Sequence, residues 1–226
     1  MSPTAALDMP TPAGSTPRDE LLALLRGGGR RERVPELICQ LEREQPADLG
    51  RDLALVEGVW ELRWSSSSLP YLATAPWLTN LQVLAPSRGQ GMNLLRLAGP
   101  LGELAGIAVR AAICVEPPAA PEQPSQRVSV RFVQGGWLGP SLAGQRLKLR
   151  RQVRQSFPAW LDITVVDAEL RLCRGNAGTV FALLRRPDLS LEALLGPPNA
   201  QGGSGQPLSG TRESTEMPVA ARDSFH

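Results

Sequence analysis

The chain has 226 residues, of which 42% are hydrophobic and 20% charged, and its formal net charge at neutral pH is +2. This length allows one domain with a sizeable core, and so small a net charge argues against a nucleic-acid partner. A membrane-spanning helix needs about 18 apolar residues in a row, and no run approaches that length. Residues 1–15 lack the basic and apolar regions of a secretory signal, so we expect a protein that is not secreted.

The N-terminal part of the chain predicts a disordered segment followed by two helices. Residues 1–17 are rich in Pro, Thr, Ser and Ala and have little to bury. Residues 18–26 and 33–45 carry helical patterns, the first ended by three glycines and the second by Pro46. We expect these helices to pack as a cap on the rest of a domain that covers residues 18–186.

The rest of that domain predicts about eight short strands. Alternating apolar residues mark the strands at 56–65, 81–85, 92–98, 107–115, 127–133 and 146–154, followed by a meander over 160–186. No helix separates consecutive strands, which favours an antiparallel barrel or sandwich. An eight-stranded barrel has an interior that side chains fill or that holds one small ligand. Residues 187–226 are rich in Pro, Gly and Ser and predict a disordered tail.

Two stretches of the chain resemble the plastid lipid-associated proteins, also called fibrillins or plastoglobulins, which occur in plastids and cyanobacteria. The resemblance spans about residues 52–186 and rests on the signature residues Gly58, Trp60, Trp160, Leu161, Asp162, Ile163, Thr164, Asp167, Arg171, Arg174, Gly175, Asn176, Gly178 and Thr179. It implies a lipocalin-like β-barrel that binds an isoprenoid or acyl lipid. It also implies a place at or near photosynthetic membranes, on the cytoplasmic side of the thylakoid or in the cytoplasm.

Residues with catalytic or metal-binding chemistry are sparse. His226 is the only histidine and lies in the predicted tail, which argues against Ser-His or Cys-His catalysis. The three cysteines are scattered, and no metal-ligand spacing occurs. Asp162 and Asp167 are five residues apart across a strand end, where a turn or surface role is the simpler interpretation. We therefore expect no enzymatic activity, no cofactor and no metal.

Five aromatic residues on predicted strands are candidates for lining a cavity, because flat rings offer a large apolar area at low entropic cost. They are Trp60, Trp64, Phe132, Trp160 and Phe181. Their positions fit a filled core equally well, so both interpretations remain open. We also expect Arg171 or Arg174 to lie over Trp60 in a cation–π contact that closes the base of the barrel.

A second set of residues predicts contact with a membrane surface. Apolar residues in a connection at 65–80 and in a predicted loop at 134–142 supply anchors, and one strand supplies a basic face. The set is Leu69, Tyr71, Trp77, Trp137, Leu138, Arg146, Lys148, Arg150 and Arg154. An ordinary lid and a solvated strand face would show the same pattern.

Three functions remain open from the sequence. The first is binding of a hydrophobic small molecule or lipid. The second is a structural coat on lipid globules or thylakoids, built from a filled barrel. The third is an enzyme like the bilin chromophore lyases, whose barrels are also lipocalin-like but whose sequence signature differs from the one in this chain.

Overall fold

The computed structural model describes residues 15–27, 29–67, 74–99, 106–142, 145–152 and 159–197. The helices are α1 (Pro17–Leu25), α2 (Val34–Glu44), α3 (Leu49–Val56) and α4 (Leu191–Leu195). The strands are β1 (Gly58–Ser65), β2 (Leu78–Ala85), β3 (Gln90–Leu97), β4 (Gly106–Val115), β5 (Arg127–Leu142), β6 (Gln145–Gln152), β7 (Ala159–Val166), β8 (Leu170–Gly175) and β9 (Val180–Arg185).

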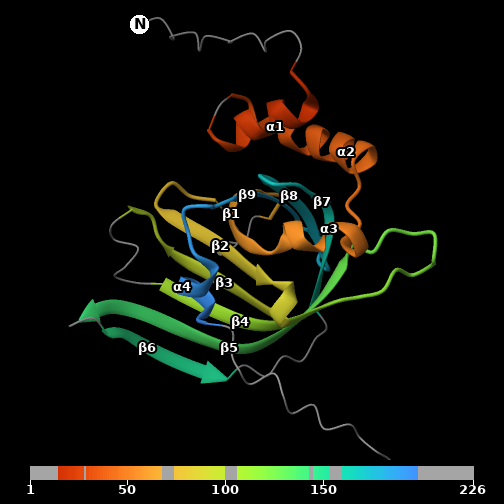
Figure 1. The fold of residues 1–226 in the computed structure, drawn as a ribbon. Helices are drawn as coiled ribbons and strands as arrows, with labels where there is room; N and C mark the ends of the chain where they lie inside the picture. Colours follow the sequence, from red (N-terminus) through yellow and green to blue (C-terminus); the bar gives the residue numbers. More distant parts are fainter. Residues whose placement is uncertain are drawn as a thin grey trace, which may run out of the picture.

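The strands form one antiparallel sheet that closes on itself (Figure 1). Hydrogen-bonded neighbours follow the order β4-β3-β2-β1-β9-β8-β7-β5, and an additional pairing between β4 and β5 completes the barrel. β6 pairs only with β5 among the described strands and takes no part in the closure. The prediction of a mainly β fold, with an eight-stranded antiparallel barrel and N-terminal helices, is confirmed.

β5 is the longest strand and divides its pairing between two neighbours. Its first part pairs with β7 through Arg127–Val130, and its second part pairs with β6. Between these parts, Val133 is an extra residue that interrupts the register with β4, as in a β-bulge. The predicted loop over 134–142 is therefore wrong: these residues continue β5, and Trp137 lies opposite Ile107 of β4.

α3 closes one end of the barrel, which we call the closed end. Its side chains Leu49 and Val56 join the same buried cluster as Trp60. The backbone N–H of Leu49 donates to the carbonyl of Ser125 at 2.7 Å. Asp48 caps the helix by accepting from the N–H of Gly50. This helix was not predicted from the sequence: residues 49–55 were assigned to no element, and Val56 was assigned to the strand at 56–65.

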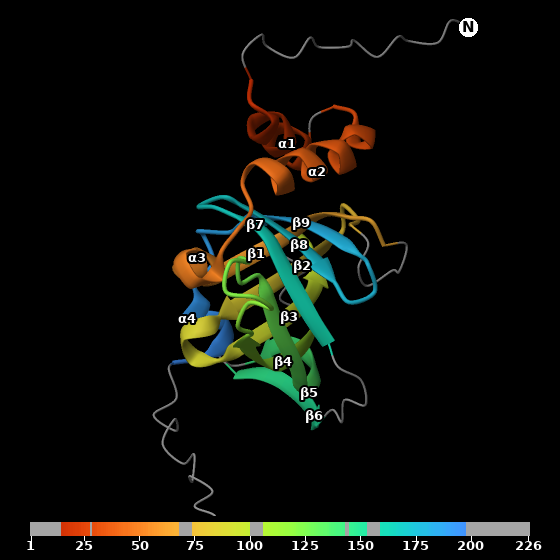
Figure 2. The same ribbon diagram turned by 90° about the vertical axis from the view of Figure 1, so that its right-hand side faces the viewer.

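α1 and α2 cover the outer face of β7, β8 and β9, on the side of the barrel away from β6 (Figure 2). The capping box of Thr16 and Asp19 starts α1, and Pro17 occupies its first turn. The buried residues of this layer are Leu21, Leu22, Leu24, Leu25, Val34, Leu37, Ile38, Leu41, Val165, Leu170, Leu172 and Ala182. β8 is consequently buried on both faces.

The chain remains structured after β9, so the prediction of a tail from residue 187 is wrong at its start. Residues 187–197 are described and contain α4, whose Leu195 is buried. Leu195 packs with Val83 and Leu94 on the outer face of β2 and β3. The Pro and Gly residues around this short helix hid its apolar pattern. Residues 1–14 and 198–226, the rest of the predicted tails, lie outside the described residues.

Candidate binding site in the barrel interior

The closed half of the barrel interior is lined by buried side chains. Residues two apart on a strand share a face, and residues opposite each other on neighbouring strands share it too. The interior cluster contains Trp60, Leu62, Leu84, Ala111, Ile113, Val128, Ile163, Cys173, Phe181 and Leu183, with Val115, Val130, Phe132 and Leu161 packed against it. Two of the predicted cavity-lining aromatics, Trp60 and Phe181, thus lie in the buried interior, and Phe132 borders it.

Trp64 and Trp160, the other two predicted cavity-lining residues, do not face the interior. β1 carries an extra residue between Leu62 and Trp64, and this bulge turns Trp64 outward, against the helical layer. Trp160 precedes the inward-facing Leu161, so it points to the outer face. There the guanidinium carbon of Arg127 lies 3.9 Å from the Trp160 ring centroid.

Two arginines lie over the fully buried ring of Trp60 at the closed end. The guanidinium carbon of Arg171 is 5.0 Å from the ring centroid, and that of Arg185 is 4.3 Å from it. The indole N–H donates to the carbonyl of Val56 at 2.9 Å. The structure therefore shows the expected cation–π contact for Arg171. Arg174 points to the outer face, where its Nε donates to Glu42 at 2.8 Å.

Arg185 is the residue of this contact that the sequence analysis missed. Its Nε donates to the carbonyl of Ala168 at 2.7 Å, and its Nη atoms donate to the carbonyls of Glu57 and Leu55. This arginine therefore joins the end of β9 to the end of α3. Nothing in the sequence distinguishes it from the adjacent Arg186, which pairs with Glu61 instead.

Gly58 leaves the space that Arg185 occupies. Its φ is +145°, and a Cβ atom there would overlap the Nη1 atom of Arg185. We expect Gly58→Ala to lower the free energy of unfolding by about 1–3 kcal/mol. Gly178→Ala is a matched control, because Gly178 also has a positive φ but no described atom lies within 4 Å of the place that its Cβ would take. Urea unfolding of both variants tests this, and equal losses would contradict a specific role for the Arg185 contact.

Arg171 is a fully buried cation that lacks a charged partner among the described residues. Its Nη2 donates to the Oε1 of Gln82, while Nε and Nη1 have no hydrogen-bond partner in the described part of the chain. Burial lowers the pKa of Arg171 and raises the pKa of the Cys173 thiol beside it. The neutral thiol therefore does not balance the charge of the guanidinium.

The open end of the barrel, opposite α3, presents exposed apolar side chains on its interior-facing side. Ile107 of β4 lies opposite Trp137 of β5, which in turn lies opposite Leu149 of β6. These side chains are 55%, 43% and 71% exposed, respectively. Ile107 shares its face with the inward-pointing Ala111 and so belongs to the interior surface. We call Ile107, Trp137 and Leu149 the apolar row.

The predicted membrane-contact residues are only partly described. Trp77, just before β2, is 66% exposed, and its carbonyl accepts from the N–H of Ala98 at the open end. Trp77 and Trp137 therefore lie at the same end. Leu69, Tyr71 and Arg154 lie outside the described residues, as do the side chains of Leu138, Arg146, Lys148 and Arg150. Among the described residues, no helix is both long and apolar enough to cross a bilayer.

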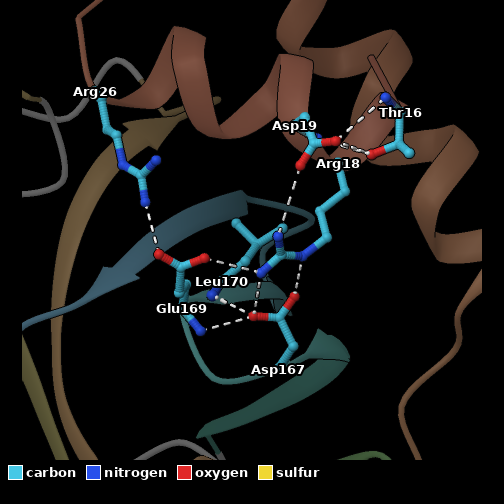
Figure 3. A network of polar contacts seen from close by, with 7 residues as sticks. All are labelled: Thr16, Arg18, Asp19, Arg26, Asp167, Glu169 and Leu170. Atoms are coloured by element: carbon cyan, nitrogen blue, oxygen red, sulfur yellow. Dashed lines mark hydrogen bonds and ion pairs between the residues drawn. The ribbon is translucent and has the colours of Figure 1, made fainter. Parts of the chain in front are cut away.

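The two aspartates of the signature make structural ion pairs. Asp162 accepts hydrogen bonds from Nε and Nη2 of Arg127, at 2.7 and 2.9 Å. Asp167 accepts from the N–H groups of Glu169 and Leu170 and from Nε of Arg18 at 2.6 Å (Figure 3). It thereby fixes the β7–β8 turn and binds α1 to it. Within the described residues, no group of three or more His, Cys, Asp or Glu could hold a metal ion.

The contact between Asp167 and Arg18 makes stability depend on pH. Burial raises the pKa of Asp167, but Arg18 and the two N–H groups outweigh it and lower the pKa below the usual value. The stabilisation is therefore complete above the unfolded-state pKa of about 3.9 and is lost as pH falls through the lower folded-state pKa. We expect Asp167→Asn to cost about 1–3 kcal/mol at neutral pH. Chemical denaturation from pH 7 to pH 3 should show a smaller acid-dependent loss in this variant than in the wild type, and parallel curves would contradict this.

Comparison with known proteins gives one family. The family model PAP_fibrillin matches residues 22–184, from the second half of α1 through α2, α3 and the barrel strands to Leu184 of β9. None of the curated proteins and none of the solved structures compared with the chain matches it.

Proposed function

Because the chain belongs to the PAP_fibrillin family of plastid lipid-associated proteins, we propose that its barrel binds an apolar small molecule, an isoprenoid or acyl lipid, without transforming it. The observation that carries this proposal is the apolar row at the open end. Ile107, Trp137 and Leu149 are large side chains on the interior-facing side that remain in contact with water. A bound apolar chain would cover them, and covering such a surface is the main driving force for binding an apolar ligand.

We further propose that the protein works peripherally at photosynthetic membranes, on their cytoplasmic side, with its open end toward the lipid. Two observations support this orientation. Trp77 is the most exposed described tryptophan, and it lies at the same end as Trp137. Tryptophan favours the interface between lipid and water. A ligand could then pass between the membrane and the barrel without crossing water.

One observation favours a second candidate, a structural coat on lipid globules or thylakoids. The side chains around Trp60 and Phe181 in the closed half of the interior are already buried without a ligand. In a coat protein, the open half would only contact lipid and would hold no ligand.

Native mass spectrometry of the full chain purified from its source cell separates these candidates. The expected result is a retained apolar species, released by the substitution of Ile107 and Leu149 by Ser. Leu55→Ser is the matched control, because Leu55 is a partly exposed apolar residue of α3 at the closed end. A ligand-free protein in every preparation would favour the coat.

Flotation with anionic liposomes tests the membrane contact. We expect the wild type to float and the double variant Trp77→Ser, Trp137→Ser to float less, while Leu55→Ser floats as the wild type does. Each basic residue near an anionic surface contributes about 1 kcal/mol, and salt screens this contribution. Flotation should therefore also weaken with added salt because β6 carries Arg146, Lys148 and Arg150. Flotation that neither the double substitution nor salt reduces would contradict this surface.

A further inference from the structure

The buried guanidinium of Arg171 has more hydrogen-bonding capacity than the protein around it uses. Nε and Nη1, which together carry more than half of the N–H donors of an arginine side chain, have no partner among the described residues. A buried donor without a partner is costly, and a buried charge without a counter-charge costs more. Such groups are rare in folded proteins, and a bound ion is one of the ways in which their missing interactions are completed.

No described group near Arg171 can supply the missing negative charge. Gln82 and the Cys173 thiol are neutral neighbours. The other charged group that acts on Arg171 is Arg185, which is also a cation. Arg185 is itself bound to the carbonyls of Leu55, Glu57 and Ala168. The closed end of the interior therefore has an excess of positive charge.

The position of Arg171 relative to the apolar row indicates how a bound anion with an apolar chain would be oriented in the barrel. Gln82, its hydrogen-bond partner, lies on β2 two residues from Asn80, which is about 7 Å along the strand. Asn80 lies opposite Leu95, and Leu95 lies opposite Ile107 of the apolar row. An anionic group at Arg171 would thus lie toward the closed end of the interior face on which Gln82, Asn80, Leu95 and Ile107 follow one another toward the open end.

We propose that Arg171 binds the carboxylate of a long-chain monocarboxylic acid, whose apolar chain extends over the apolar row toward the open end. This inference rests on the proposed binding function and specifies the head group and orientation of the ligand. Each side-chain nitrogen of Arg185 already donates to a carbonyl, so of the two arginines Arg171 alone offers nitrogens without a partner among the described residues, and its one guanidinium balances one negative charge. A phosphate monoester carries about 1.5 to 2 negative charges at neutral pH and would leave part of that charge buried without a partner. The amide of Gln82 can also donate to the carboxylate.

The test compares ligands that share a chain and differ in the head group. Isothermal titration calorimetry of the full chain with palmitic acid, hexadecanol and methyl palmitate should give palmitate an affinity at least about 10-fold higher than the other two, as expected for hydrogen bonds to a charged group. Equal affinities would overturn the role of the carboxylate and leave apolar binding intact. No binding of any of the three would overturn the carboxylate proposal together with the binding of an acyl lipid. Tighter binding of hexadecyl phosphate than of palmitate would overturn the choice of a carboxylate.

Substitutions of Arg171 and Arg174 test whether Arg171 causes the preference for palmitate. Arg171→Met should bind all three ligands equally, and its melting temperature without ligand should be no lower than that of the wild type, because an apolar residue removes an unpaired buried charge. Arg171→Lys should keep part of the preference and covers the case in which the Met variant fails to fold. Arg174→Met, on the outer face of the same strand, should keep all of it. A preference for palmitate that persists in Arg171→Met would overturn the proposal.

Discussion

Trp60→Ala should lower the free energy of unfolding by about 3–5 kcal/mol, the cost of removing a large buried aromatic side chain. Trp60 is fully buried, and its indole N–H donates to the carbonyl of Val56. The substitution would leave a cavity between α3 and the strands and would remove the ring beneath Arg171 and Arg185. Equilibrium unfolding in urea, followed by far-ultraviolet circular dichroism, measures the loss.

The control for this prediction is the exposed Trp77, whose side chain is 66% exposed. Trp77→Ala should change stability by no more than about 0.5 kcal/mol, as for other surface substitutions. If Trp60→Ala cost as little as Trp77→Ala, the barrel would not depend on this ring.

Deletion of residues 1–45, which removes α1 and α2, should abolish the folded barrel. The two helices cover the apolar outer face of β7, β8 and β9 with eight buried Leu, Ile and Val side chains. Burial of one such side chain contributes about 1.5–3 kcal/mol, and the net stability of a domain is about 5–15 kcal/mol. The free energy lost with this layer therefore exceeds the net stability of the domain. Soluble yield and the cooperativity of thermal unfolding are the measurements.

Deletion of residues 1–14 is the matched control for this truncation. It keeps the capping box of Thr16 and Asp19, together with the ion pair between Arg18 and Asp167. Its melting temperature should equal that of the full chain, because the composition of residues 1–14 gives them little to bury. A barrel that folds without residues 1–45 would show that the helices are an accessory layer.

The barrel itself could be predicted from the sequence because most strands alternate regularly between apolar and polar residues. In β4, for example, Ala111 and Ile113 are two residues apart and both face the interior. Their partners on β5, Phe132 and Val130, are also two residues apart. The helices of the cap were predictable for a similar reason, since Leu37, Ile38 and Leu41 of α2 form one buried stripe.

The predicted directions of side chains are wrong where a strand carries an extra residue. A bulge shifts the alternation by one position, so Trp64 points outward although Trp60 and Leu62 point inward. No residue type in that stretch signals the bulge. Trp160 is a different case, because the alternation of Leu161 and Ile163 already places it on the opposite face. Its direction was predictable and was overlooked.

The site depends on contacts that span the whole chain, and these carry no local signal. Arg171 lies in the interior because β8 is buried on both faces and Leu170 and Leu172 occupy the outer one. Its hydrogen-bond partner Gln82 is 89 residues away. Arg185 meets the carbonyls of Leu55 and Glu57 only after β9 pairs with β1.

The division of β5 between two neighbours gives the barrel one of its two shortest junctions. β5 and β7 share four residue pairs in the described structure, as β1 and β2 do, whereas β4 and β5 share ten. Local opening begins where the fewest backbone hydrogen bonds must break, so amide protons at this junction should exchange with solvent sooner than those of β8. Arg127 spans the same junction by its ion pair with Asp162 and its contact with Trp160. Asp162 and Trp160, two residues of the family signature, thus hold Arg127 across this junction. The strength of these two contacts sets how often β5 and β7 separate and expose the interior between them.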